Sequence, residues 1–277
     1  MKQLGVDISE HNGSVDFSIL QNAGVQFVIL RCGFGSDYTN QDDARFKENV
    51  QKAEAAGMPW GAYLYSYAVN SSMAKSEAQH ALRLLQEKKP LYGVWYDVED
   101  PQIAGGDLTA TCQTFCGALE AAGLYTGIYA SLSWLDSLLN SPQLDRYDKW
   151  VAQWNSHCTY AKPYGIWQYT DSLSIGGKAF DGNYAYKDYP SLISAMDGGN
   201  GTGKEEDEMP TYQQWKDYME QYLAELAAKP VADWAQGAVA YAKESGLMNG
   251  DTDGNFRPQS PITRQELAAV LANLGNQ

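Results

Sequence analysis

The feature that most restricts the fold of this chain is an alternation of apolar and helical segments over residues 3–139. Each apolar segment is short and has no polar face, which is typical of strands in a parallel sheet that is covered on both sides. These segments occupy residues 3–9, 25–32, 60–67, 91–99 and 124–130. Segments with helical spacing follow them at residues 17–23, 42–56, 72–88, 108–122 and 131–139. This order predicts parallel strands joined by right-handed crossovers.

After residue 139 the helices disappear from the pattern. Three further strand-like segments, at residues 149–154, 165–170 and 179–184, follow one another without helical spacing between them. Eight strands, five of which carry helices, predict an α/β fold with an irregular TIM-like barrel of five β/α units plus three further strands. The region is shorter than the usual eightfold barrel of about 250 residues.

The fourth apolar segment ends in a cluster of acidic residues within the stretch LYGVWYDVEDP, residues 91–101. Asp97 and Glu99 are two residues apart, so on a strand they point to the same side, with Cβ atoms roughly 6–7 Å apart. Burial and mutual repulsion would raise the pKa of at least one of them. An enzyme can obtain a protonated acid beside an ionised one in this way. Taken alone, the triplet fits a solvated strand end or a helix N-cap better.

Acidic and aromatic residues recur at the ends of other predicted strands. Asp7 ends the first strand and Asp181 lies near the end of the eighth. Because the carboxyl ends of barrel strands meet at one mouth, these two acids should converge with Asp97 and Glu99. Each strand-end aromatic residue either binds substrate or packs in the core; they are Tyr63, Tyr65, Tyr129, Trp154, Trp167 and Tyr169.

Charge and composition exclude several functions. A net charge of −14 argues against a nucleic-acid partner, because phosphate binding requires Lys and Arg side chains. The four cysteines and three histidines have no metal-binding spacing, so we predict neither a metal nor a cofactor, and we expect buried free thiols. No window reaches membrane-span length and the start lacks the apolar stretch of a signal peptide. We therefore expect synthesis in the cytoplasm and no membrane contact.

Eight short motifs occur in one order over residues 3 to about 190: GVDIS, FVILRCGFG, GAYLYSY, YDVED, GIYA, KWVAQW, IWQYT and FDGN. In this order they resemble glycoside hydrolase family 25, the Chalaropsis-type lysozymes. The resemblance implies a barrel of five β/α units and three further strands. It also implies hydrolysis of the β-1,4 bond between N-acetylmuramic acid and N-acetylglucosamine in peptidoglycan.

The resemblance also implies roles for individual residues. Glu99 corresponds to the general acid, Asp97 to its carboxylate partner, and Asp7 and Asp181 to the remaining acids of the site floor. The predicted substrate-binding residues are Tyr63, Tyr65, Tyr129, Trp154, Gln168 and Asn183. Retaining, inverting and substrate-assisted courses all stay open. We favour the substrate-assisted course, in which Asp97 or Asp181 orients the acetamido group of the sugar.

The C-terminal part has a different composition. Residues 197–210 are glycine-rich and then acidic, which is typical of a linker. We predict helices over 212–228 and 233–245 and a last helix that begins in a capping box formed by Thr263 and Glu266.

Within residues 211–277, the segments GLMNG, DGNFRP and ITRQEL resemble one S-layer homology repeat. The resemblance implies binding to a secondary cell-wall polymer, with Arg257 and Arg264 as cationic candidates. A helical module that packs on the barrel or dimerises the chain is the alternative, so the module is either wall-binding or oligomerising.

These observations predict three parts, namely a catalytic barrel over residues 1–196, a linker over 197–210 and a helical module over 211–277. The predicted function is that of an endolysin-type muramidase, which acts at the bacterial cell wall on the peptidoglycan glycan strand. The alternatives are a chitinase-like N-acetylhexosaminidase and a non-catalytic wall-binding protein.

Overall fold

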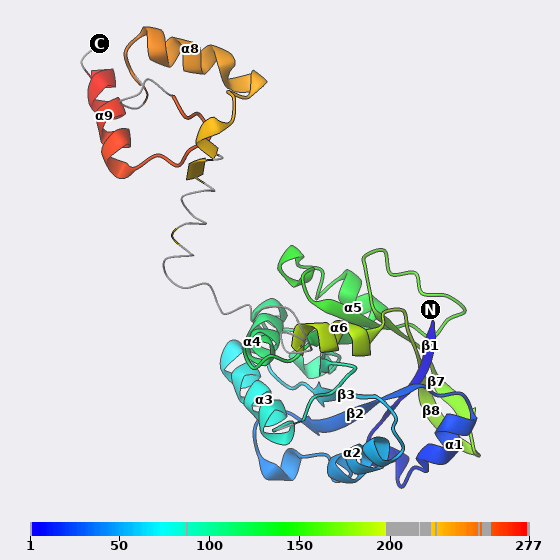
Figure 1. The fold of residues 1–277 in the computed structure, drawn as a ribbon. Coiled ribbons are helices and arrows are strands. Elements are labelled where there is room, and N and C mark those ends of the chain that lie inside the picture. Colours follow the sequence, from blue (N-terminus) through cyan, green and yellow to red (C-terminus); the bar gives the residue numbers. More distant parts are fainter. Residues whose placement is uncertain are drawn as a thin grey trace. The chain divides into compact units, whose positions relative to one another are not determined.

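The computed structural model describes residues 2–86, 88–197, 216, 223–224, 226–248, 250 and 256–275. The chain divides into two compact units, Met1–Gly201 and Thr202–Gln277 (Figure 1). Among the described residues, no helix combines the length and the apolar character needed to cross a bilayer.

The first unit is a closed barrel of eight strands in sequential order. Neighbouring strands from β1 to β7 are parallel, whereas β8 runs antiparallel to both β7 and β1. The strands are β1 (Gln3–Ile8), β2 (Phe27–Phe34), β3 (Trp60–Tyr65), β4 (Val94–Asp97), β5 (Thr126–Ser131), β6 (Asp148–Ala152), β7 (Ile166–Ile175) and β8 (Lys178–Ala185). This order confirms the predicted barrel.

A helix follows each of the first five strands, as predicted. These helices are α1 (Phe17–Asn22), α2 (Phe46–Ala55), α3 (Ser71–Leu84), α4 (Leu108–Ala121) and α5 (Leu132–Asp136). Asp16, Asn70 and Asp107 cap the starts of α1, α3 and α4, because each side chain accepts a bond from an otherwise unpaired backbone N–H of the first turn. Between β6 and β8, where every residue is described, there is no helix.

Several boundaries differ from the prediction. Strand β4 ends at Asp97 rather than at residue 99, so Glu99 lies on the loop beyond the strand. Helix α2 starts at Phe46, four residues later than predicted, because a 3-10 turn over Thr39–Gln41 precedes it. Strands β7 and β8 are longer than predicted, since Gly176 and Gly177 both adopt positive φ angles and close a two-residue hairpin.

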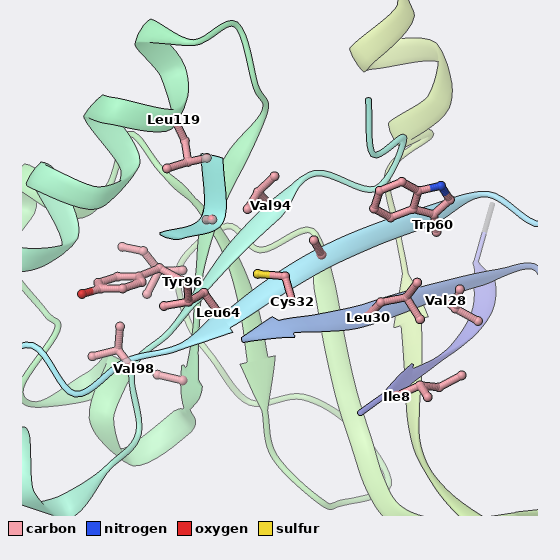
Figure 2. Packing of buried hydrophobic residues seen from close by; sticks show 14 of the residues in the cluster. Ile8, Val28, Leu30, Cys32, Trp60, Leu64, Val94, Tyr96, Val98 and Leu119 are labelled. Atoms are coloured by element: carbon pink, nitrogen blue, oxygen red, sulfur yellow. The ribbon is translucent and has the colours of Figure 1, made fainter. Parts of the chain in front are cut away.

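One set of strand side chains packs outward against the helices. Figure 2 shows this layer, with Val28 and Leu30 of β2, Leu64 of β3 and Val94 of β4 in one continuous cluster. Tyr96 stacks on Phe115 of α4 with ring centroids 4.0 Å apart. Three of the four cysteines are buried free thiols, as predicted, and Cys158 is half-buried.

The alternate set of side chains fills the barrel interior with aromatic rings. Trp95 of β4 and Trp150 of β6 are buried there and contact each other edge to face. Glycines on neighbouring strands make room for such rings. A Cβ atom at Gly127 would lie 2.4 Å from Trp95, and one at Gly5 would lie 2.3 Å from the ring of Phe27.

Helix α6 (Tyr189–Asp197) closes the end of the barrel where β1 to β7 begin. Tyr189 is fully buried, contacts Trp95, and donates a hydrogen bond to Asp148 Oδ2 (2.7 Å). The interior is therefore filled from this end upward, and the open part of the barrel is the mouth at the carboxyl ends of β1 to β7.

The second unit contains the 3-10 helix η5 (Asp233–Ala235), α8 (Gln236–Glu244) and α9 (Arg264–Gly275). The predicted capping box is confirmed: Thr263 N donates to Glu266 Oε2 (2.7 Å), and Glu266 N donates to Thr263 Oγ1 (3.2 Å). Most of the helix predicted over 212–228, and the linker segment 198–210, lie outside the described residues.

Candidate active site

A cavity of about 720 Å³ opens at the barrel mouth. Five acidic side chains lie in its wall: Glu10 and the four that the sequence predicted, Asp7, Asp97, Glu99 and Asp181. Strand register explains the convergence. Asp7 of β1 is the direct cross-strand partner of Asp181 on β8, while Asp97 ends β4.

Asp7 is 6% exposed and accepts two hydrogen bonds on one oxygen. Gln168 Nε2 and Asn183 Nδ2 both donate to Asp7 Oδ2, at 3.0 and 2.7 Å. Burial raises the pKa of Asp7 well above its usual value, and the charge of Asp181 raises it further. The two amide donors oppose this rise without cancelling it.

Asp97 is 3% exposed, and its Oδ1 atom has no hydrogen-bond partner among the described residues. Burial raises the pKa of Asp97 well above the usual value, with added contributions from the charges of Glu99 and Asp7. Arg31 is the cation that opposes these effects. A buried acceptor without a partner is costly, which marks this oxygen as one that a ligand could satisfy.

Glu99 is half-buried and lines the same cavity, although it lies two residues beyond the end of β4. Burial is the main cause that raises the pKa of Glu99. The charges of Asp181 and Asp100 raise the pKa further. Glu99 is thus an acid that keeps its proton to a higher pH than a solvated glutamate while it remains in contact with the cavity.

The four predicted aromatic residues all line the cavity: Tyr63, Tyr65, Tyr129 and Trp154. Trp154 is 62% exposed, and its indole Nε1 donates to Gln168 Oε1 (3.2 Å), which holds a large apolar face at the rim. Tyr65 instead directs its hydroxyl to Asp100 Oδ2 (3.2 Å). Of the other strand-end aromatic residues, Trp167 and Tyr169 do not line the cavity but contact Tyr184.

The two predicted amide residues lie at different depths. Gln168 lines the cavity, whereas Asn183 is fully buried beneath it and is absent from its lining. Trp150 Nε1 donates to Asn183 Oδ1 (2.8 Å), so both ends of this side chain are used within the protein. Asn183 therefore supports Asp7 from below rather than facing the opening.

The cavity wall also contains charged residues that were not predicted from the sequence. Arg31 on β2 donates from Nε to Asp43 (2.8 Å) and from Nη2 to Glu10 (2.8 Å), and both Arg31 and Glu10 line the cavity. A signal was present, because Arg31 interrupts the apolar run FVILRC. Phe34 and Tyr67 were also missed; their rings contact each other, with centroids 6.3 Å apart.

The arrangement suits acid–base chemistry on a sugar. Carboxyl groups with raised pKa values can donate a proton to a leaving oxygen or stabilise a developing positive charge. The aromatic faces beside them match the apolar faces of sugar rings. Among the described residues, no group of three or more His, Cys, Asp or Glu side chains is arranged to hold a metal ion. Fold and site together define a glycoside hydrolase.

Comparison with known proteins identifies the family of this chain. The chain belongs to Glycosyl hydrolases family 25, whose sequence profile matches residues 6–178. A second profile, that of the S-layer homology domain, matches residues 228–268. Both resemblances that the sequence motifs indicated are thereby confirmed.

Several relatives of the chain are named lysozymes, autolysins or endolysins. The present chain is 29% identical over 175 residues to the autolytic lysozyme of Clostridium acetobutylicum. The matched region covers 62% of this chain and 52% of that protein. The modular autolysin LytC of Streptococcus pneumoniae, solved with a synthetic peptidoglycan ligand, matches with a TM-score of 0.60 and 25% identity over 67% of this chain and 47% of LytC. The chain thus spans about half the length of these two proteins.

The catalytic domain of the endolysin ply40, from bacteriophage P40 of Listeria monocytogenes, matches with a TM-score of 0.58 and 25% identity. The match covers 70% of this chain and 97% of that domain. The part of the present chain that matches is thus about one whole catalytic domain.

Proposed function

We propose that the protein is an endolysin-type muramidase that hydrolyses the β-1,4 bond between N-acetylmuramic acid and N-acetylglucosamine in peptidoglycan. The observation that carries the proposal is the gathering of Asp7, Asp97, Glu99 and Asp181 around one cavity in a member of family 25. The relatives named as lysozymes, and the autolysin solved with a peptidoglycan ligand, support the same substrate.

In the proposed mechanism Glu99 is the general acid. It donates its proton to the glycosidic oxygen as the bond to the sugar C1 breaks. The acetamido oxygen of the same sugar forms a bond to C1 and so gives a cyclic, positively charged intermediate, which water then opens. Glu99, now ionised, accepts a proton from that water. A positioned acid–base group of this kind typically contributes about 10²–10⁴-fold in rate.

Asp97 is the proposed partner of the acetamido group. Its Oδ1 lacks a hydrogen-bond partner among the described residues, and the acetamido N–H is a donor of the right kind. Asp181, with Asp7 behind it, is the second carboxyl group that would stabilise the positive charge of the intermediate. Trp154, Tyr63 and Tyr129 would contact the sugar rings along the cavity wall.

We further propose that the three parts predicted from sequence act together at the cell wall. The S-layer homology match over 228–268 supports cell-wall association, and a secondary cell-wall polymer is the proposed ligand of this module. The barrel would then act on glycan strands near the point of attachment.

Mass spectrometry of digested peptidoglycan tests the proposal. A muramidase produces new reducing ends on N-acetylmuramic acid. Reducing ends on N-acetylglucosamine would instead indicate a glucosaminidase, and turnover of chitin oligomers without release of muropeptides would indicate a chitinase-like enzyme. Pelleting of the protein with cell walls without any product would indicate a wall-binding protein that lacks catalysis.

A further inference from the structure

Gln168 on β7 connects the exposed rim of the cavity with its buried floor. Its side chain is 3% exposed, and its carboxamide makes three hydrogen bonds. Oε1 accepts from Tyr129 Oη (3.1 Å) and from Trp154 Nε1 (3.2 Å), while Nε2 donates to Asp7 Oδ2 (3.0 Å). These bonds use the oxygen of the amide group twice and one of the two N–H groups of its nitrogen.

Indole groups fix the orientation of the two amides beside Asp7. An indole N–H can only donate, so Trp154 requires an oxygen at its end of Gln168, and the amide nitrogen must then face Asp7. The same holds for Asn183, whose Oδ1 accepts from Trp150 Nε1 (2.8 Å) and whose Nδ2 donates to Asp7 (2.7 Å). Both amides therefore donate to the same atom, Asp7 Oδ2.

This arrangement decides where a proton on Asp7 can lie. Oδ2 accepts two N–H bonds, so the proton of a neutral Asp7 belongs on Oδ1. Asp181 is the cross-strand partner of Asp7. Its carboxyl group is the neighbour that can accept a hydrogen bond from a proton on Asp7 Oδ1. Burial raises the pKa of Asp181, and a hydrogen bond from Asp7 lowers it. A neutral Asp7 thus favours the ionised form of Asp181.

We propose that Gln168 is a positioning residue. It connects Trp154 at the rim to Asp7 through hydrogen bonds, and it fixes which oxygen of Asp7 donates a hydrogen bond to Asp181. Gln168 acts through Asp7 and contacts no reacting atom. This role rests on the proposed muramidase function, because it assigns Asp181 to stabilise positive charge in that reaction. The substrate-binding role that the sequence predicted for Gln168 stays a prediction beside this one.

The variant Gln168→Glu tests the role with almost no change in shape. It can still accept from Trp154 and Tyr129, but it places a carboxylate oxygen against Asp7 Oδ2. The added negative charge raises the pKa of the coupled acids, so the acid limb of the kcat/KM profile should move to higher pH by about half a unit or more. We expect kcat to fall roughly 10–100-fold, because the floor acids are displaced.

Gln3→Glu is the matched control. Gln3 lies on β1 at the opposite end of the barrel, where its Oε1 accepts from the hydroxyl of Tyr92 (2.9 Å). The same chemical change there should leave the pH profile in place. A merely structural role for Gln168 would lower the melting temperature of Gln168→Glu without moving its pH profile, and that result would overturn the proposal.

If Gln168→Glu does not fold, Trp154→Phe carries the test. Trp154 is mostly exposed, so this variant should fold, and it keeps a six-membered aromatic ring at the rim while it removes the pyrrole ring with its N–H. We expect kcat to fall about three- to tenfold with KM within about twofold, since the anchor of Gln168 is weakened while the ring remains. A raised KM with an unchanged kcat would make Trp154 a stacking surface alone and would contradict the coupling.

The two proposals fail in different ways. Wild-type protein that releases no reducing ends from peptidoglycan would contradict the muramidase function before any variant is compared. Active wild-type protein, with a Gln168→Glu profile superimposed on its own, would contradict only the role of Gln168.

Discussion

At the scale of single residues, the acids of the mouth lie in an environment that disfavours their charge. Asp97 and Asp7 are nearly inaccessible to water, and each has a pKa raised chiefly by burial. A raised pKa in the folded state means that the folded chain binds protons more tightly than the unfolded chain. The contribution of these groups to stability therefore decreases as the pH rises from about 4 through the raised values.

Asp97→Asn should stabilise the protein and inactivate it. The amide removes the cost of burying a charge or holding a proton at pH 7, where each unit of pKa shift corresponds to about 1.4 kcal/mol. A gain of 1 kcal/mol would raise the melting temperature by about 2–4 °C in a domain of this size. The gain should shrink near pH 4, and thermal unfolding at both pH values measures it. A lower melting temperature at pH 7 would contradict this account.

Glu99→Gln should abolish proton donation while it preserves the fold. We expect kcat on cell walls to fall about 10²–10⁴-fold, with a melting temperature close to that of the wild type. Glu54→Gln is the control, because Glu54 is an exposed residue of α2 that pairs with Lys88 and lies outside the cavity. A turbidity assay on purified walls compares the two variants. Near-full activity of Glu99→Gln would remove Glu99 from the role of acid.

Asp7, Asp97 and Glu99 could be predicted because they lie at or just beyond the carboxyl ends of apolar strands, and these ends converge in a barrel. Asp181 instead lies within the antiparallel strand β8 and reaches the mouth as the cross-strand partner of Asp7. The depth of Asn183 could not be predicted, since its burial depends on Trp150 of a different strand. Arg31 could have been predicted from its place in an apolar run, because a cation that interrupts buried strand residues needs an acidic partner, and Asp43 and Glu10 supply it.

At the scale of elements, strand and helix types followed from sequence, whereas their ends depended on tertiary context. The stretch 171–174 is polar except for Leu173, yet it continues β7 because the β7–β8 hairpin supplies a hydrogen-bonded partner on one side. Glu99 was assigned to a strand and lies on a loop. Its position beside Asp97 in the cavity nevertheless matches the expectation that both acids face the same way.

Helix α6 should contribute strongly to the stability of the barrel, because its Tyr189 packs against Trp95 in the barrel interior and covers the end opposite the cavity. Tyr189→Ala removes a fully buried ring and a hydrogen bond to Asp148, so we expect a loss of about 3–5 kcal/mol in the free energy of unfolding. Tyr38→Ala, at a residue that is 64% exposed, should cost little by comparison. Chemical denaturation measures both. Equal effects of the two variants would show that α6 does not support the barrel.

At the scale of the whole molecule, the chain is composed of two compact units, and every residue that lines the cavity belongs to the first. A chain shortened to residues 1–201 should therefore hydrolyse soluble glycan fragments at a rate within about twofold of the full chain. If the second unit binds a wall polymer, the shortened chain should pellet less with intact walls and clear them more slowly. Equal pelleting of both chains would contradict wall binding by the second unit.

The reversed direction of β8 has a practical consequence for protein engineering. Because this strand runs against its neighbours, the polypeptide leaves the barrel beside Tyr189, on the face away from the acids. Whatever is fused after α6 thus begins remote from the entrance for glycan, and exchanging the natural C-terminal module for another anchor requires no redesign of that entrance.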